Sequence, residues 1–127
     1  MATTDSAIRR DFPGRRWLSV VLRGLHLVAV IHLGASVVAD LLAAAARSGG
    51  LAVLFSGLAL WALDIWQKPG HLREVAGLSM FLKLALVAGM ILTPELHRPL
   101  FWLIVVWSAV FSHAPASFRN ARWLPRR

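Results

Sequence analysis

Long apolar blocks dominate this sequence, and they restrict its fold more than any other feature. Four blocks of 15 to 30 residues contain few charges: 17–46, 50–66, 75–92 and 99–113. A helix crosses the ~30 Å hydrocarbon core of a bilayer with about 20 apolar residues, or fewer where flanking Arg and Lys side chains reach the interface. The chain is 57% hydrophobic and 16% charged, whereas soluble domains carry roughly a quarter charged residues. The blocks therefore predict an integral membrane protein.

Short turn-forming segments separate these blocks. They lie at 47–50, 67–70 and 93–99 and contain glycine and proline residues, which favour turns. Short connections force consecutive helices to run antiparallel. Strands do not compete, because a closed membrane barrel needs many alternating segments instead of continuous apolar runs. We expect an all-α fold, a four-transmembrane-helix up-down bundle that forms a single domain over residues 1–127.

Basic residues gather on one side of the expected bundle. The chain has 14 Lys and Arg residues against 6 Asp and Glu, a net charge of +8. All but Arg47 and Arg98 fall on the side of the two basic terminal arms, 1–16 and 114–127. These residues are Arg9, Arg10, Arg15, Arg16, Arg23, Lys68, Arg73, Lys83, Arg119, Arg122, Arg126 and Arg127. The excess of positive charge in cytoplasmic loops then predicts cytoplasmic N- and C-termini in a bacterial-type inner membrane.

The same charge pattern indicates which binding partners to expect. The arginines bracket apolar blocks instead of forming a stripe on a soluble fold, so nucleic acid is not an expected partner. We expect the basic arms to lie on anionic lipid or on another membrane subunit. Self-association is the other option, since small residues at four-residue spacing, such as Ala85 and Gly89, allow helices to approach closely.

The chain has no cysteine. Disulfides, thiolate metal sites and iron-sulfur clusters are therefore excluded, and any metal needs His, Met or carboxylate ligands. Met80 and Met90 lie ten residues apart and make a poor copper pair.

Polar side chains inside the apolar blocks are the strongest functional signal, because they are costly in lipid. With both termini cytoplasmic, His26, Asp64, Lys83 and His113 all fall in the cytoplasmic half of the bundle. This convergence predicts either a site for an anionic planar cofactor or a buried ion pair between Asp64 and Lys83. Structural roles are the alternatives: packing for His26, an interfacial amine for Lys83 and a helix C-cap for His113.

A second polar group lies farther along the first block. His32, Ser36 and Asp40 are four residues apart and drift by only about 40° per step on a helix, so they form one stripe. His26 lies about 120° away from the stripe, and the two histidines therefore cannot readily ligate one metal. The stripe predicts a hydrogen-bonded helix seam, a face toward a partner or a proton path.

Two stretches carry a family resemblance. Leu22–Ala29 (LRGLHLVA), followed by Gly34, and Leu82–Val87 (LKLALV) resemble helix signatures of copper-resistance protein D-like membrane proteins. They are also similar to the related bacterial membrane protoporphyrinogen oxidases, in which a His on the first helix and a later Lys are functional and haem b is bound. The resemblance implies that His26 and Lys83 hold the matching positions.

The leading hypothesis is therefore a small inner-membrane protein that binds haem b for electron transfer or porphyrinogen oxidation. His26 and either Lys83 or His113 would be the axial metal ligands, with the porphyrin between the first, third and fourth helices and its propionates toward Arg23. The alternative is a cofactor-free accessory or assembly subunit of a larger membrane complex. A transporter has less support, since four helices leave little room for a gated path.

Overall fold

The computed structural model describes residues 10–40 and 43–122, and most of this part of the chain is helical. Its four long helices are α1 (Arg15–Val38), α2 (Ala43–Gln67), α3 (Val75–Leu92) and α4 (His97–His113). Short 3-10 helices, η1 (Pro69–Arg73) and η2 (Pro94–Leu96), occupy the later two connections, and α5 (Ala116–Arg119) follows α4. The described residues contain no strand beyond an isolated bridge between Glu74 and Arg122. The all-α expectation is confirmed.

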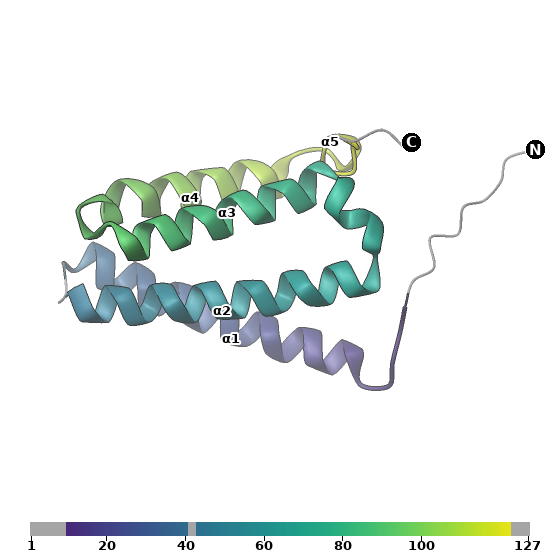
Figure 1. Ribbon diagram of the computed structural model, residues 1–127, viewed down its shortest axis with the longest axis horizontal. Coiled ribbons are helices and arrows are strands. Elements are labelled where there is room, and N and C mark those ends of the chain that lie inside the picture. The colour runs from purple at the N-terminus through teal and green to yellow at the C-terminus, as the bar shows by residue number, and fades with distance from the viewer. Residues whose placement is uncertain (1–9, 41–42, 123–127) are drawn as a thin grey trace, which may run out of the picture.

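The long helices pack in two layers (Figure 1). Helices α1 and α2 form one layer, α3 and α4 form the other, and consecutive helices run antiparallel. Helix α2 contacts both α1 and α3, while α4 contacts α3 and, less extensively, α1. The start of α1, the α2–α3 turn and the end of α4 consequently lie at the same end of the bundle.

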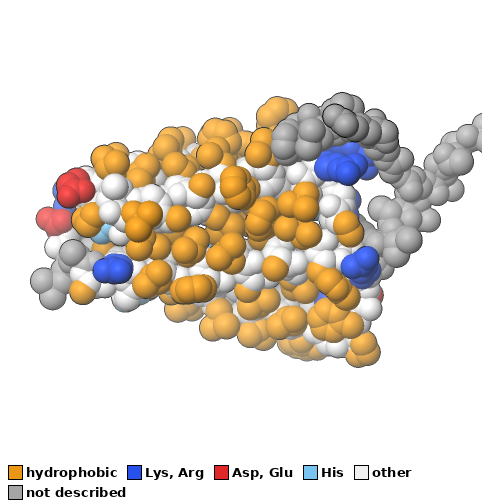
Figure 2. All heavy atoms as spheres, in the orientation of Figure 1, with side chains coloured by type: hydrophobic (Ala, Val, Ile, Leu, Met, Phe, Trp, Pro, Cys, Tyr) orange, Lys and Arg blue, Asp and Glu red, His pale blue; other side chains and the backbone are white. Residues whose placement is uncertain are grey.

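The exterior of the bundle is largely apolar. Helices α1, α2 and α3 are long and apolar enough to cross a membrane, judged by length and composition, and the 17-residue α4 is not among them. Figure 2 shows apolar side chains over the length of the visible face and charged side chains toward its two ends. Large apolar side chains as exposed as Trp17 (76%) and Leu92 (79%) contribute to this surface. Such extensive apolar exposure is typical of a surface that contacts lipid or a partner.

A small apolar core joins the two layers. Its buried members come from α1, α2 and α3 and are Ala29, Leu33, Val37, Val53, Val87 and Met90. No residue of α4 is fully buried, although Trp107 Nε1 on α4 donates a hydrogen bond to Ser79 Oγ on α3 at 2.8 Å. Helix α4 is thus held by partly buried contacts and by this polar link.

The first helix is shorter than the block 17–46 predicts. Helix α1 ends at Val38, and α2 already begins at Ala43. Asp40 adopts a φ of 55°, in the left-handed region where a right-handed helix cannot continue. The boundary near residue 46 is therefore wrong, because a backbone reversal at Asp40 interrupts one continuous apolar run.

The Gly-Gly pair read as a turn belongs instead to α2. A Cβ on Gly49 would lie 2.9 Å from the Cα of Leu33 on α1, and one on Gly50 would lie 2.8 Å from Cγ1 of Ile91 on α3. Both distances are too short for a side chain, so these glycines allow α2 to approach its two neighbours closely. Their role is helix packing, and the turn expected at 47–50 is absent.

A buried carboxylate organises the α2–α3 turn. Glu74 is only 5% exposed; its carboxylate accepts a hydrogen bond from Lys68 Nζ and lies 3.3 Å from His71 Nδ1. Burial by itself raises the pKa of Glu74, but the hydrogen bonds from Lys68 and His71 outweigh it and hold the pKa below its ordinary value. The ionised form therefore stabilises the turn.

Glu74→Gln is expected to lower stability at neutral pH by about 1–3 kcal/mol, because a neutral amide replaces the charged acceptor of Lys68 and His71 at a buried position. The folded-state pKa lies below the unfolded one, so this stabilisation is complete above the ordinary value of 4.5. It disappears as the pH falls through the folded-state pKa. Thermal unfolding of the detergent-solubilised protein at pH 7 and under acid checks both statements. Glu95→Gln, at an exposed site on η2, is the control; equal losses in the two variants would contradict the role of Glu74.

Candidate functional site

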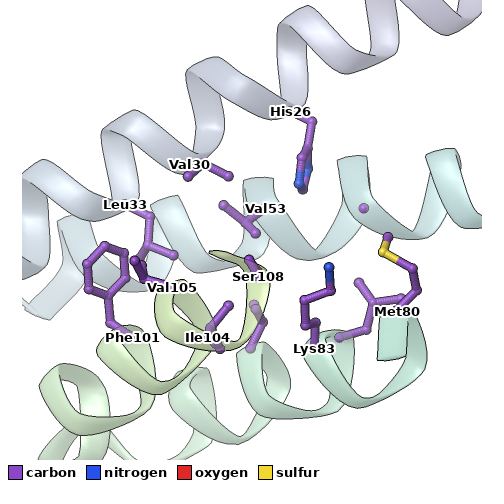
Figure 3. A pocket seen from close by; sticks show the side chains of 13 residues that line it. His26, Val30, Leu33, Val53, Met80, Lys83, Phe101, Ile104, Val105 and Ser108 are labelled. Carbon is purple, nitrogen blue, oxygen red and sulfur yellow. The ribbon is translucent and has the colours of Figure 1, made fainter. Parts of the chain in front are cut away.

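A cavity of about 330 Å³ lies between the two layers and is lined by residues of all four long helices. Figure 3 shows His26 reaching into it from α1, toward Lys83 on α3. Ser108 on α4 is the third polar side chain of the lining. The remaining lining residues are Val30, Leu33, Val53, Gly57, Met80, Leu84, Val87, Phe101, Ile104 and Val105. The cavity is thus apolar with a few converging polar groups, the usual character of a small-molecule site.

The imidazole of His26 is held by α2. Its Nδ1 lies 2.7 Å from Ser56 Oγ, and the Ser56 hydroxyl donates to the carbonyl of Ala52 at 2.7 Å. A hydroxyl has one proton, so Ser56 Oγ accepts from Nδ1–H when it donates to the carbonyl, and otherwise donates to Nδ1. Ser56 thus orients the imidazole, and Nε2 is the ring nitrogen that does not take part in this hydrogen bond.

Gly57 lets α2 come close to this imidazole. A Cβ at position 57 would lie 3.4 Å from Cε1 of His26 and 2.9 Å from Cδ2 of Leu84. The backbone of α2 therefore forms one wall of the cavity, against the ring of His26.

Lys83 brings a primary amine to the cavity, without an acidic partner there. No carboxylate belongs to the lining, and among the described residues no salt bridge involves Lys83. Asp64 lies half-exposed toward the end of α2 and does not pair with it. The expected alternative of a buried ion pair between Asp64 and Lys83 is therefore wrong. An amine in such surroundings favours a ligand that carries a negative group.

Two other candidates lie away from the cavity. His113 is exposed at the C-terminal end of α4, and Arg23 is exposed on α1, one turn before His26. Neither residue lines the cavity. Of the four residues expected to bind a cofactor, the structure brings together only His26 and Lys83. A shared site for His26 and His113 as metal ligands is not formed.

The stripe on α1 does not form a side-chain relay. The Ser36 hydroxyl donates to the backbone carbonyl of His32 at 2.8 Å, and so does not link the side chains of the stripe. His32 lies against α2 near Gly49, and Asp40 pairs with Arg98 at 3.2 Å at the far end of the bundle. The stripe therefore divides into a helix contact, a buried hydroxyl and an exposed ion pair.

Sequence reasoning missed the partners of His26. Ser56 lies thirty residues away along the chain, and its only sequence signal is that it is a polar residue in an apolar block. Met80 was considered only as half of a copper pair, but it lies three residues before Lys83, on the same face of α3. Nothing in the sequence distinguishes Ser108 from the other serines of the apolar blocks.

No group of three or more His, Cys, Asp or Glu residues suited to a metal ion occurs in residues 10–40 and 43–122. No family model matches the chain, and no curated protein or solved structure matches it either. The functional proposal below therefore rests on the residues and geometry of this chain.

Proposed function

We propose that this chain is an integral inner-membrane protein that binds haem b at His26. Its four long helices cross the bilayer, with both termini in the cytoplasm. Three helices of sufficient length and apolarity and the apolar exterior support this placement. The 17 residues of α4 lie at the lower limit for a span, and the basic residues near the start of α1 and the end of α4 favour the orientation.

The placement of His26 in an apolar cavity, with Nδ1 bonded to Ser56, is the observation that carries this proposal. A histidine that binds iron uses one ring nitrogen as ligand and donates a hydrogen bond from the other, which sets the tautomer and the ring orientation. Ser56 Oγ is placed to accept such a hydrogen bond, 2.7 Å from Nδ1. This contact supports a role for His26 as the residue that would hold the haem iron.

The other lining residues suit the same ligand. Of Lys83 and His113, only Lys83 lines the cavity; its amine would hold the iron or pair with a propionate. Arg23 lies outside the cavity lining, so we do not propose that it pairs with the haem propionates. The volume of about 330 Å³ is at the small end of ligand cavities, roughly 300–1,000 Å³.

Bound haem supplies one-electron redox chemistry, in electron transfer or in porphyrinogen oxidation. The chain contributes the environment of that chemistry. His26 would hold the iron, Ser56 would keep the imidazole in place, and the apolar lining would exclude water. Ligand basicity and low local dielectric are the levers with which a protein sets a redox potential.

The test is an absorption spectrum of the protein purified in mild detergent, first oxidised and then reduced with dithionite. A Soret band that shifts on reduction supports the proposal. A colourless preparation with stoichiometric partner bands would overturn it and would favour the alternative, a cofactor-free accessory or assembly subunit of a larger complex.

Ser56→Ala is expected to weaken haem binding by about 10- to 100-fold, the usual cost of losing a partner that orients a metal-ligating histidine. Titration of the haem-free protein with haem, followed by Soret absorbance, measures this loss. The control is Ser112→Ala, because Ser112 makes a similar hydrogen bond to a backbone carbonyl, that of Ala109, but is exposed and outside the cavity. Unchanged affinity in both variants would show that the Nδ1 hydrogen bond does not orient the ligand.

A further inference from the structure

A second groove lies on the outer side of α2, separate from the cavity of His26. Its volume is about 730 Å³, and it is lined by Arg10, Leu58, Trp61, Ala62, Ile65, Trp66 and Pro69. Four of these residues, Leu58, Trp61, Ala62 and Ile65, follow the three- and four-residue spacing of one helix face. At 1.5 Å per residue they line a track of about 10 Å along the helix axis.

Arg10 lies at the turn end of this track. Its backbone N–H donates to the carbonyl of Gln67 at 3.3 Å. Phe12, two residues later, packs edge-on against Trp66 with ring centroids 5.4 Å apart. These two contacts tie the segment that precedes α1 to the end of α2, so Arg10 is held beside the aromatic end of the track.

The guanidinium of Arg10 has no acidic partner in the described part of the chain. The neighbouring carboxylate, Asp11, is engaged by Arg15 Nε at 2.7 Å. The nearby amine of Lys68 is engaged by Glu74, and no carboxylate lines the groove. An unpaired cation at one end of an apolar track is complementary to an amphiphile with an anionic head.

We propose that this groove binds one anionic phospholipid. The phosphate lies on the guanidinium of Arg10, which can donate two parallel hydrogen bonds to it, and one acyl chain lies along the track of α2. The indole of Trp66 is amphipathic and suits the level of the headgroup. This assignment rests on the membrane placement proposed above and is independent of haem.

Native mass spectrometry of the detergent-purified full chain tests the site. The probes are phosphatidylglycerol and phosphatidylcholine with identical acyl chains. We expect the protein to retain one phosphatidylglycerol in preference to phosphatidylcholine. Arg10→Gln should weaken the binding of phosphatidylglycerol about fivefold, the contribution of one basic residue near anionic lipid. The binding of phosphatidylcholine should not change. Arg16→Gln, an exposed arginine outside the groove, should change neither; equal effects of the two Arg variants would overturn the site.

A second pair of variants tests the acyl track. Ala62→Trp fills the groove and should weaken the binding of both lipids. Ala59→Trp, also exposed on α2 but outside the lining, should not change the binding of either lipid. Circular dichroism confirms equal helix content in both. Full displacement of phosphatidylglycerol by inorganic phosphate would overturn the phospholipid assignment and leave only an anion site. Release of the protein from membranes by alkaline carbonate would instead overturn the membrane placement.

Discussion

Replacing His26 with alanine is expected to abolish the Soret band while the abundance of the protein in the membrane is unchanged. Nε2 of His26 is the free imidazole nitrogen in the cavity, and its loss should cost more than the 10- to 100-fold expected for a residue that only orients a ligand. The removed ring is half-buried, and its side-chain hydrogen bond is to Ser56, which keeps its bond to the carbonyl of Ala52. The fold therefore loses little.

His32→Ala is the matched control for this experiment. His32 lies on the same helix but is exposed and outside the cavity, so this variant should keep a normal Soret band. The measurement is the ratio of Soret absorbance to protein, with membrane abundance followed by immunoblot. A normal Soret band in His26→Ala would place the ligand elsewhere. Loss of the protein itself would assign His26 to packing.

Gly77→Ala is expected to destabilise the protein by about 3 kcal/mol, the upper part of the usual range for inserting a methyl group into a packed site. A Cβ at Gly77 would lie 2.0 Å from the backbone oxygen of His71 and 2.9 Å from its carbonyl carbon. Neither atom can rotate away as a side chain can. The start of α3 would have to move off η1, and this movement would also displace Lys83, two turns farther along α3.

Gly89→Ala, on the same helix, should instead stabilise the protein. Nothing lies within 4 Å of a Cβ at Gly89, and alanine is favoured over glycine in a helix interior by roughly 0.5–1 kcal/mol. Thermal unfolding in detergent should therefore separate the two variants clearly. Equal melting temperatures would contradict the close contact between η1 and α3.

Much of the fold was predictable from the sequence. The apolar blocks indicate the four long helices, and α3 (Val75–Leu92) has the expected bounds. The error at the α1–α2 boundary has a specific cause. Alanine and leucine continue without a break from residue 41 to 46, so hydropathy holds no signal for the reversal at Asp40. The Gly-Gly pair was misread because a glycine that allows close helix packing and a glycine in a turn look alike in a sequence.

The candidate site was predictable only in part. A histidine and a lysine inside apolar helices stand out because of their cost in lipid, and the structure places both at one cavity. His113 and Asp64 lie toward the expected end of the bundle, but their side chains do not line the cavity. The position of a residue along a helix follows from counting residues, whereas the direction of its side chain depends on how the helix is rotated. The bond from His26 to Ser56 joins two helices, and no local pattern predicts such a pair.

The sequence by itself determined that this chain is helical and that its surface is apolar. Backbone polar groups in lipid must be satisfied within one segment, and long apolar blocks satisfy them only as helices. The tertiary structure alone decided which polar groups meet. Helix rotation and spacing are set by contacts between distant residues, such as Gly49 against Leu33 and Gly57 against His26. The cavity that joins His26 and Lys83 depends on contacts of this kind, and the position of Arg10 beside the track depends on its contact with Gln67.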